Sequence, residues 1–150
     1  DTFAGMTEPT AYDFENNTGQ YAFKEYDSKI SIDHNKWCYA SLEDVKNNIK
    51  KYQKNIDVKF IEGDILKTLL NKSNVPDKIS VLRLDTDWYE STKIELEVLY
   101  PKLQKGGVIL IDDYGHWGGC KKAVDEYFSK MQNKPLFIPS DYTGRVAVKT

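Results

Sequence analysis

The sequence predicts an α/β fold with a mostly parallel sheet and an antiparallel hairpin at the end of the chain. Segments with strand-like and helix-like patterns alternate, which favours right-handed crossovers between parallel strands. The run Val108 to Ile111 is apolar on both faces, as is typical of a buried parallel strand. Two short strand-like pieces, residues 136–138 and 145–148, close the chain and predict the hairpin at one edge of the sheet.

Length and composition indicate one globular domain that spans residues 1–150. Of the 150 residues, 40% are hydrophobic and 29% are charged, which is enough for a real core. The formal net charge of −2, with Lys and Arg interleaved with acids, argues against a nucleic-acid partner. The two cysteines have no metal-ligand spacing, and no signal-like or membrane-length apolar run occurs. We therefore expect a cytoplasmic protein with no membrane partner.

The first half of the chain begins with about forty polar and aromatic residues that lack periodicity, which predicts a long irregular segment with a short helix at most. Ser41 then reads as the N-cap of an amphipathic helix, with apolar residues at helical spacing up to Tyr52. Residues 58–62 have the pattern of a short strand. A turn follows, and residues 65–70 form a second helical run.

The second half alternates more regularly. A strand is predicted over 79–84, and a helix from about Ser91 closes at Gly106 and Gly107. The buried strand that starts at Val108 follows, and a further helix repeats its apolar positions up to Met131.

Acidic residues follow the predicted strands at the point where each one ends. Gly63 and Asp64 follow the strand 58–62, and Asp85 follows the strand 79–84, with Asp87 two residues further on. Asp112 and Asp113 follow the strand that starts at Val108. In open α/β sheets ligands bind beyond these carboxyl ends, so the acids should converge. Crowded carboxylates raise one another's pKa unless a cation neutralises them, and oxygen ligands suit Mg²⁺, Mn²⁺ or Ca²⁺.

Two ambiguities remain at this acidic edge. Asp87 fits a metal ligand as well as Asp85 by spacing alone. Asp112 and Asp113 have an ordinary explanation too, since an Asp after a strand often caps the next helix, here the one near Trp117.

Other residues near the strand ends have both a functional and an ordinary interpretation. Gly63 and Asp64 form a turn into a helix, or the acid accepts a hydrogen bond from an adenine amino group. His116, in a Gly-flanked loop, is a surface residue or a proton shuttle. Two of the three tryptophans stand beside the acidic strand ends, where an aromatic face could stack on a sugar or adenine or simply pack. His34, Cys38 and Cys120 are interpreted as structural.

The motifs as a whole resemble the macrocin and mycinamicin O-methyltransferase family. The resemblance rests on Leu82 to Thr92, Leu99 to Leu103, Gly106 and Gly107, Ile111 to Trp117 and Ala123 to Phe128, together with the opening Asp1 to Met6 and the closing Asp141 to Arg145. It therefore covers essentially the whole chain, and the combination is specific.

The resemblance implies a Rossmann-like class I methyltransferase fold, with S-adenosyl-L-methionine as methyl donor, Mg²⁺ as metal and a small-molecule glycosylated substrate. By position, Asp85, Asp112 and Asp113 are similar to metal ligands, with Asp85 also the general base and His116 a second catalytic candidate. The cofactor-binding candidates are Asp1, Thr2, Phe3, Gly63, Asp64 and Ile65, where Asp1 resembles the acid that binds the ribose and Asp64 lies where the adenine is held.

One departure from the family pattern concerns the start of the chain. Family members begin with a strand and a Gly-rich loop that holds the methionine end of the cofactor, and no such cluster precedes Asp1. We therefore expect an N-terminally truncated methyltransferase sheet, or one that forms a homo-oligomer to cover an exposed strand edge. The alternative function is a truncated, non-catalytic binding or assembly domain.

Overall fold

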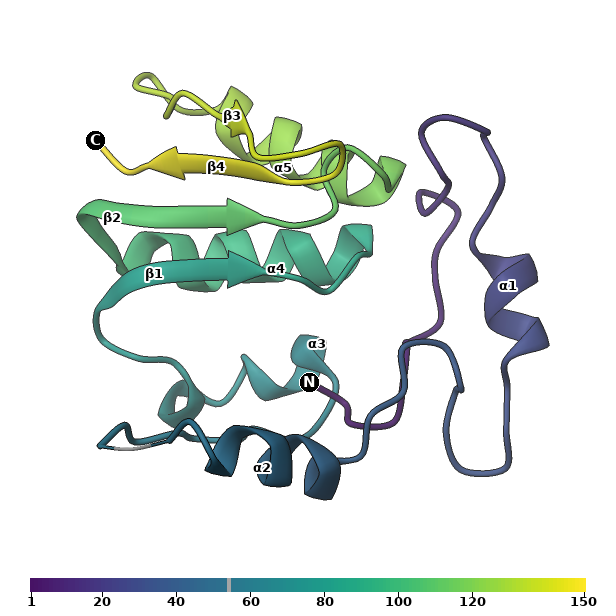
Figure 1. The fold of residues 1–150 in the computed structure, drawn as a ribbon. Coiled ribbons are helices and arrows are strands. Elements are labelled where there is room, and N and C mark those ends of the chain that lie inside the picture. Colours follow the sequence, from purple (N-terminus) through teal and green to yellow (C-terminus); the bar gives the residue numbers. More distant parts are fainter. Residues whose placement is uncertain (54) are drawn as a thin grey trace.

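The computed structural model describes residues 1–53 and 55–150 and contains a four-stranded sheet in the order β1-β2-β4-β3. Strand β1 (Ile79–Leu84) runs parallel to β2 (Leu103–Ile111). Strand β4 (Arg145–Val148) is antiparallel to β2 and to the short edge strand β3 (Ile138–Pro139). Figure 1 shows β1 and β2 pointing the same way and β4 returning beside them. The α/β class and the antiparallel C-terminal hairpin are confirmed.

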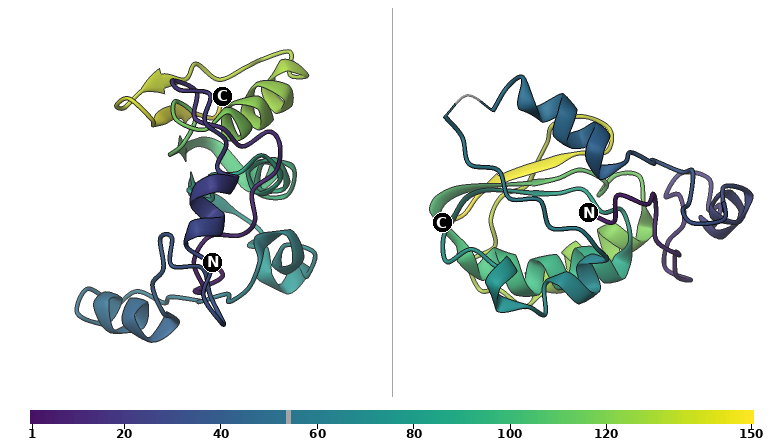
Figure 2. Two further views of the ribbon diagram at one scale, coloured as in Figure 1. Left: turned by 90° about the vertical axis from the view of Figure 1, so that its right-hand side faces the viewer. Right: turned by 90° about the horizontal axis from the view of Figure 1, so that it is seen from below.

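Two helices, α4 (Tyr89–Leu99) and α5 (Gly118–Ser129), pack together on one face of the sheet, as Figure 2 shows. Helix α4 provides the crossover between β1 and β2, and the 3₁₀ turn η2 (Tyr100–Lys102) follows it. The most buried side chains join the two layers, and they include Leu84, Leu96 and Ile109, which are at most 2% exposed. Burial of apolar surface between these layers is the main stabilising contribution to the fold.

The first half of the chain contains only short elements, namely α1 (Phe23–Ser28), α2 (Leu42–Lys50), α3 (Ile65–Thr68) and η1 (Lys72–Asn74). Ser41 caps α2 as expected, because its side chain accepts a hydrogen bond from the amide of Asp44. The predicted irregular segment is confirmed too: residues 1–40 contain α1 alone and lie across the edge where β1 and β2 end (Figure 1).

The strand predicted over residues 58–62 is not formed, and this expectation was wrong. The reason is the lack of a partner, since an extended segment becomes a strand only when its peptide groups pair with a neighbour. Pairing is limited to one residue: the amino group of Asp1 donates to the carbonyl of Ile61 at 3.3 Å, and the amide of Gly63 donates to the carbonyl of Asp1 at 2.9 Å.

Gly106 and Gly107 were predicted to end a helix, and the structure places them inside β2 instead. The helix has already ended at Leu99, because Pro101 in the following turn has no amide hydrogen to continue it. Gly106 has a φ of +81°, and the β1–β2 register shifts nearby. Gly106 and Gly107 therefore allow the irregularity in the first part of β2 and do not end a helix.

The described residues contain no helix that is long and apolar enough to cross a membrane.

Candidate functional site

Three carboxylates meet at the carboxyl ends of β1 and β2. Asp85 directly follows β1, Asp87 lies two residues further on, and Asp113 follows β2 after one residue. One carboxylate oxygen from each lies within 4.8 Å of the others. The predicted convergence is therefore confirmed for the acids after β1 and for Asp113, and it includes both candidates, Asp85 and Asp87, between which the spacing could not choose. It was wrong for Asp64, which caps α3 instead, because the strand predicted before it is not formed. We call these three residues the acid cluster.

Asp112 is close to the acid cluster but has a different partner. The Arg83 guanidinium lies 3.0 Å from Asp85 and 3.1 Å from Asp112, so it bridges these two carboxylates. All three of these side chains are about half exposed, at 57% for Arg83 and 44% for each acid, so the salt bridges add little stability. The ligand role of Asp112 stays a prediction, whereas Asp87, the alternative that the spacing left open, lies in the acid cluster.

The acid cluster is electrostatically costly to the chain. Burial, followed by repulsion from Asp87 and Asp85, raises the pKa of Asp113 to about 8. Burial and repulsion from Asp85 raise the pKa of Asp87 to about 6. The pKa of Asp85 is raised by burial and by Asp112, against the opposing effect of Arg83. Among the described residues no Lys or Arg forms a salt bridge with Asp87 or Asp113.

The loop between β1 and α4 places Asp87 through an unusual backbone conformation. Asp87 has a φ of +67°, in the left-handed region of backbone conformation that residues other than glycine seldom occupy. The hydroxyl of Ser91 donates to the carbonyls of Thr86 and Trp88 at 2.9 and 3.0 Å, which fixes the loop on either side of Asp87. Thr86 donates its own hydroxyl to Glu95 on α4 at 2.9 Å.

Glu95 is a buried acid that no motif in the sequence indicates. Its side chain is 4% exposed on the inner face of α4, and burial raises its pKa to about 8. Charged residues in helices are usually exposed, so the sequence around Glu95 did not indicate that this side chain is buried.

Three tryptophans form an aromatic group beside the acid cluster. The ring centroids of Trp88 and Trp117 lie 5.0 Å apart, and Trp37 lies 5.6 and 5.9 Å from them. Trp88 and Trp117 are 2% and 5% exposed, so both are packed into the core. Trp37 is half-buried. The indole N–H of Trp88 donates to the carbonyl of Thr7, and that of Trp117 donates to Asp87 at 3.2 Å.

His116 precedes this last tryptophan and is half-buried. Its ring packs edge-on against Trp117, with centroids 4.6 Å apart, and lies 6.1 Å from the ring of Tyr142. Its backbone amide donates to the carbonyl of Asp113. These contacts hold the residue next to the acid cluster, and its catalytic role stays a prediction.

The irregular N-terminal segment is anchored to the site by Asp13, an acid that no sequence motif indicates. Asp13 is fully buried, and its carboxylate accepts hydrogen bonds from the amides of Tyr89 at 2.8 Å and Thr10 at 2.6 Å. A side chain at Gly119 would place a Cβ only 1.9 Å from Asp13, so the glycine leaves room for it. Asp13 therefore fixes the segment to the first turn of α4 and lies against the first turn of α5.

The six cofactor-binding candidates also lie together. The backbone hydrogen bonds between Asp1 and residues 61 and 63 place Asp1, Thr2 and Phe3 beside Gly63, Asp64 and Ile65. The carboxylate of Asp1 accepts from the amide of Phe3 at 2.7 Å, and Asp64 caps α3 by accepting from the amide of Leu66 at 2.9 Å. The turn interpretation of Asp64 is thus correct, and its contact with adenine stays a prediction.

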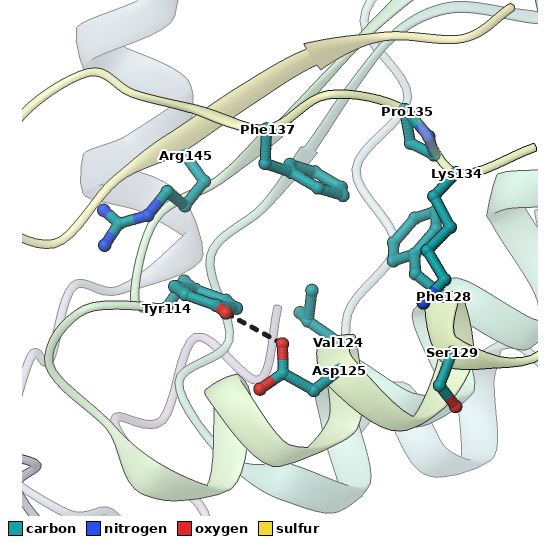
Figure 3. A pocket seen from close by; sticks show the side chains of 9 residues that line it. All are labelled: Tyr114, Val124, Asp125, Phe128, Ser129, Lys134, Pro135, Phe137 and Arg145. Atoms are coloured by element: carbon teal, nitrogen blue, oxygen red, sulfur yellow. Dashed lines mark hydrogen bonds between the residues drawn. The ribbon is translucent and has the colours of Figure 1, made fainter.

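A separate cleft of about 250 Å³ lies between α5 and the C-terminal hairpin. Figure 3 shows Phe128 and Phe137 on its walls, Lys134 and Arg145 toward its two ends, and the hydroxyl of Tyr114 directed at Asp125. None of the acid cluster lines this cleft, so it is not the predicted metal site.

Comparison with known proteins decides the family. A family model described as Macrocin-O-methyltransferase (TylF) matches residues 1–145. The chain belongs to the macrocin O-methyltransferase family. The resemblance of its motifs to this family is thereby confirmed.

Individual family members match most of the chain. The chain is 39% identical over 107 residues to demethyldecarbamoylnovobiocin O-methyltransferase of Streptomyces niveus. This match covers 70% of the chain and 40% of that protein. The chain is also 38% identical over 113 residues to the 8-demethyl-8-(2,3-dimethoxy-alpha-L-rhamnosyl)-tetracenomycin-C 4'-O-methyltransferase of Streptomyces olivaceus. This second match covers 75% of the chain and 42% of that protein.

The fold agrees with a solved family structure. The O-methyltransferase NovP superposes on the whole chain with a TM-score of 0.77 and 32% sequence identity, and the match covers 58% of NovP. The Rossmann-like methyltransferase fold class is therefore confirmed. The chain spans about 40% of the length of the curated family members that it matches.

Proposed function

We propose that this chain forms the metal-binding and acceptor-binding part of an S-adenosylmethionine-dependent and Mg²⁺-dependent O-methyltransferase that acts on a hydroxyl of a sugar or glycosylated natural product. The observation that carries the proposal is the acid cluster, where three carboxylates share one site at the carboxyl ends of the parallel strands. Membership of an O-methyltransferase family supports the reaction class.

The residues of the acid cluster fit a hard divalent cation. All three offer carboxylate oxygens, which suit Mg²⁺ and do not suit zinc. The raised pKa values of Asp87 and Asp113 have burial and mutual repulsion as their causes, and a cation between the carboxylates would relieve the repulsion. Asp112 lies close enough to Asp85 to join them if Arg83 releases it.

The proposed chemistry needs a sugar hydroxyl to lose its proton near neutral pH. When bound, Mg²⁺ supplies Lewis acidity to the hydroxyl oxygen and S-adenosylmethionine supplies the methyl group. Asp85, the most exposed member of the acid cluster, takes the proton. Asp87 and Asp113 would carry their negative charge at the metal position once a bound cation offsets the repulsion that helps to raise their pKa values. Trp37, the half-buried member of the aromatic group, offers a face to the acceptor.

The methyl donor would be held by the second group of candidates. Asp1 and Asp64 each use a carboxylate oxygen for a backbone hydrogen bond, so each has a second oxygen to accept from the ribose and adenine of the donor. Their backbone contacts place these acids on neighbouring segments.

Titration calorimetry with MgCl₂ tests the proposal on the 150-residue chain and on Asp85→Asn. We expect measurable Mg²⁺ binding by the unchanged chain and loss of most of it in the variant. Asp77→Asn is the matched control, because Asp77 is exposed and lies before the opposite end of β1. Equal Mg²⁺ affinity for all three proteins would refute the role of Asp85, and no Mg²⁺ binding at all would refute the metal site.

A second titration with S-adenosylmethionine separates the enzyme from the alternative, a non-catalytic binding or assembly domain. Donor binding that is weakened in Asp1→Asn supports the methyltransferase. Mg²⁺ binding without any donor binding by the chain supports the alternative.

A further inference from the structure

We propose that Trp117 is a positioning residue that sets the orientation of the Asp87 carboxylate in the acid cluster, and that Mg²⁺ affinity depends on its indole N–H. This inference rests on the proposed metal site and assigns a role to an aromatic residue outside the candidate ligands. Its basis is one directed contact: the indole nitrogen of Trp117 lies 3.2 Å from a carboxylate oxygen of Asp87.

The contact joins the two loops that carry the acid cluster. Asp87 belongs to the loop after β1, and Trp117 ends the loop after β2 and precedes α5. The backbone amide of Trp117 also donates to the carbonyl of Asp113 at 2.9 Å. Trp117 therefore contacts both half-buried members of the acid cluster, Asp87 through its side chain and Asp113 through its backbone.

Trp117 can hold this position because it is itself fixed. Its side chain is 5% exposed and packs against Trp88 and Trp37. Residue 117 also forms an antiparallel bridge with Glu15, and the amide of Gly118 donates to the carbonyl of Phe14 at 2.7 Å. Because these contacts fix the Trp117 ring, its indole N–H can donate to Asp87 in one direction only.

Asp87 needs such a support more than its neighbours do. Its φ of +67° is unfavourable for an aspartate, so contacts around it must compensate. A hydrogen bond that engages one carboxylate oxygen leaves the other oxygen to act as a ligand. Hydrogen-bond partners of metal-bound carboxylates often change metal affinity by about 10-fold to 100-fold when they are removed.

The test compares Trp117→Phe with Trp88→Phe. Both changes remove one indole N–H from the same aromatic group, but the N–H of Trp88 points to the carbonyl of Thr7 and not to an acid. We expect calorimetry to show about a tenfold weaker Mg²⁺ affinity for Trp117→Phe and an unchanged affinity for Trp88→Phe. Near-ultraviolet circular dichroism and thermal unfolding establish that both variants are folded.

A double-mutant cycle with Asp87→Asn adds a measurement that a merely structural role would not change. If Trp117 acts through Asp87, the Trp117→Phe change should cost little additional Mg²⁺ affinity once Asp87 is Asn. Equal losses in Trp117→Phe and Trp88→Phe, or additive losses in the cycle, would overturn the inference while the metal site stands. Absence of Mg²⁺ binding by the unchanged chain would instead overturn the proposed function and the inference together.

Discussion

Acidic side chains occupy two contrasting environments in this chain. Asp13 and Asp64 accept hydrogen bonds from backbone amides, so their charge satisfies donors that the fold would otherwise leave unpaired. The acid cluster of Asp85, Asp87 and Asp113 has the reverse character, because these carboxylates face one another and their pKa values are raised. Loss of charge should therefore destabilise the chain in the first environment and stabilise it in the second.

The largest effect is expected at Asp13. Asp13→Ala removes the acceptor for the amides of Tyr89 and Thr10 in a fully buried position, so the free energy of unfolding should fall by about 2–4 kcal/mol. Urea unfolding measures this change. Asp13→Asn is the comparison, since its carbonyl oxygen keeps one of the two amide partners while its NH2 group faces the other donor, so it should recover only part of this stability. A change below about 0.5 kcal/mol in the alanine variant would contradict the assigned anchor role.

The second effect is a dependence of stability on pH without added metal. Asp87, Asp113 and Glu95 have pKa values raised to about 6, about 8 and about 8. Between the unfolded pKa near 4 and the folded pKa, the folded chain binds more protons than the unfolded chain, so stability falls as pH rises through this range and levels off above about 8.

Thermal unfolding from pH 5 to 8.5 measures this slope, and we expect a loss of about 2 kcal/mol after allowance for solvent screening of the partly exposed groups. Saturating Mg²⁺ should reduce the loss, because a ligand that binds only the folded state stabilises it. Stability that rises with pH over the same range would show that the acid cluster does not have the raised pKa values.

A smaller gain is expected from Asp113→Asn at pH 7 without metal. Burial and the neighbouring Asp87 and Asp85 keep Asp113 largely protonated in the folded chain at pH 7, whereas the unfolded chain ionises it. The amide needs no proton, so this cost is removed and the chain should gain about 1 kcal/mol. The same variant should lose Mg²⁺ affinity in calorimetry. A gain in stability together with a loss of Mg²⁺ affinity is what we expect of a residue whose charge serves a ligand. A loss of both stability and Mg²⁺ affinity would instead show that Asp113, like Asp13, stabilises the fold.

The smallest effect is expected at Asp64. Asp64→Ala removes the N-cap of α3, a helix of four residues, and should lower the free energy of unfolding by about 0.5–1 kcal/mol. Asp64→Ser should recover most of this stability, because serine is also a good N-cap. If donor binding also weakens in the serine variant, the second carboxylate oxygen has a role in the cofactor site beyond the cap.

The elements that the sequence predicted well are those whose local pattern and packing agree. Strand 79–84 was predicted with its observed bounds, because its residues pair along a parallel neighbour. The N-cap at Ser41 was correct because capping is a local interaction. The strand at 58–62 failed because a strand needs a partner, and the pattern of one segment cannot supply it.

For the candidate site, the sequence by itself determined that acids follow parallel strands and so meet at one edge of a sheet, and its motifs indicated the family. Only the tertiary structure decided which acids meet. Arg83 pairs with Asp112 and Asp85 together, and Asp87, whose backbone is left-handed, joins Asp85 and Asp113 in the acid cluster. Asp13, Glu95 and Trp117 also owe their roles to contacts between segments distant in sequence or to burial. Such contacts depend on how the chain packs, and no local pattern of residues encodes them.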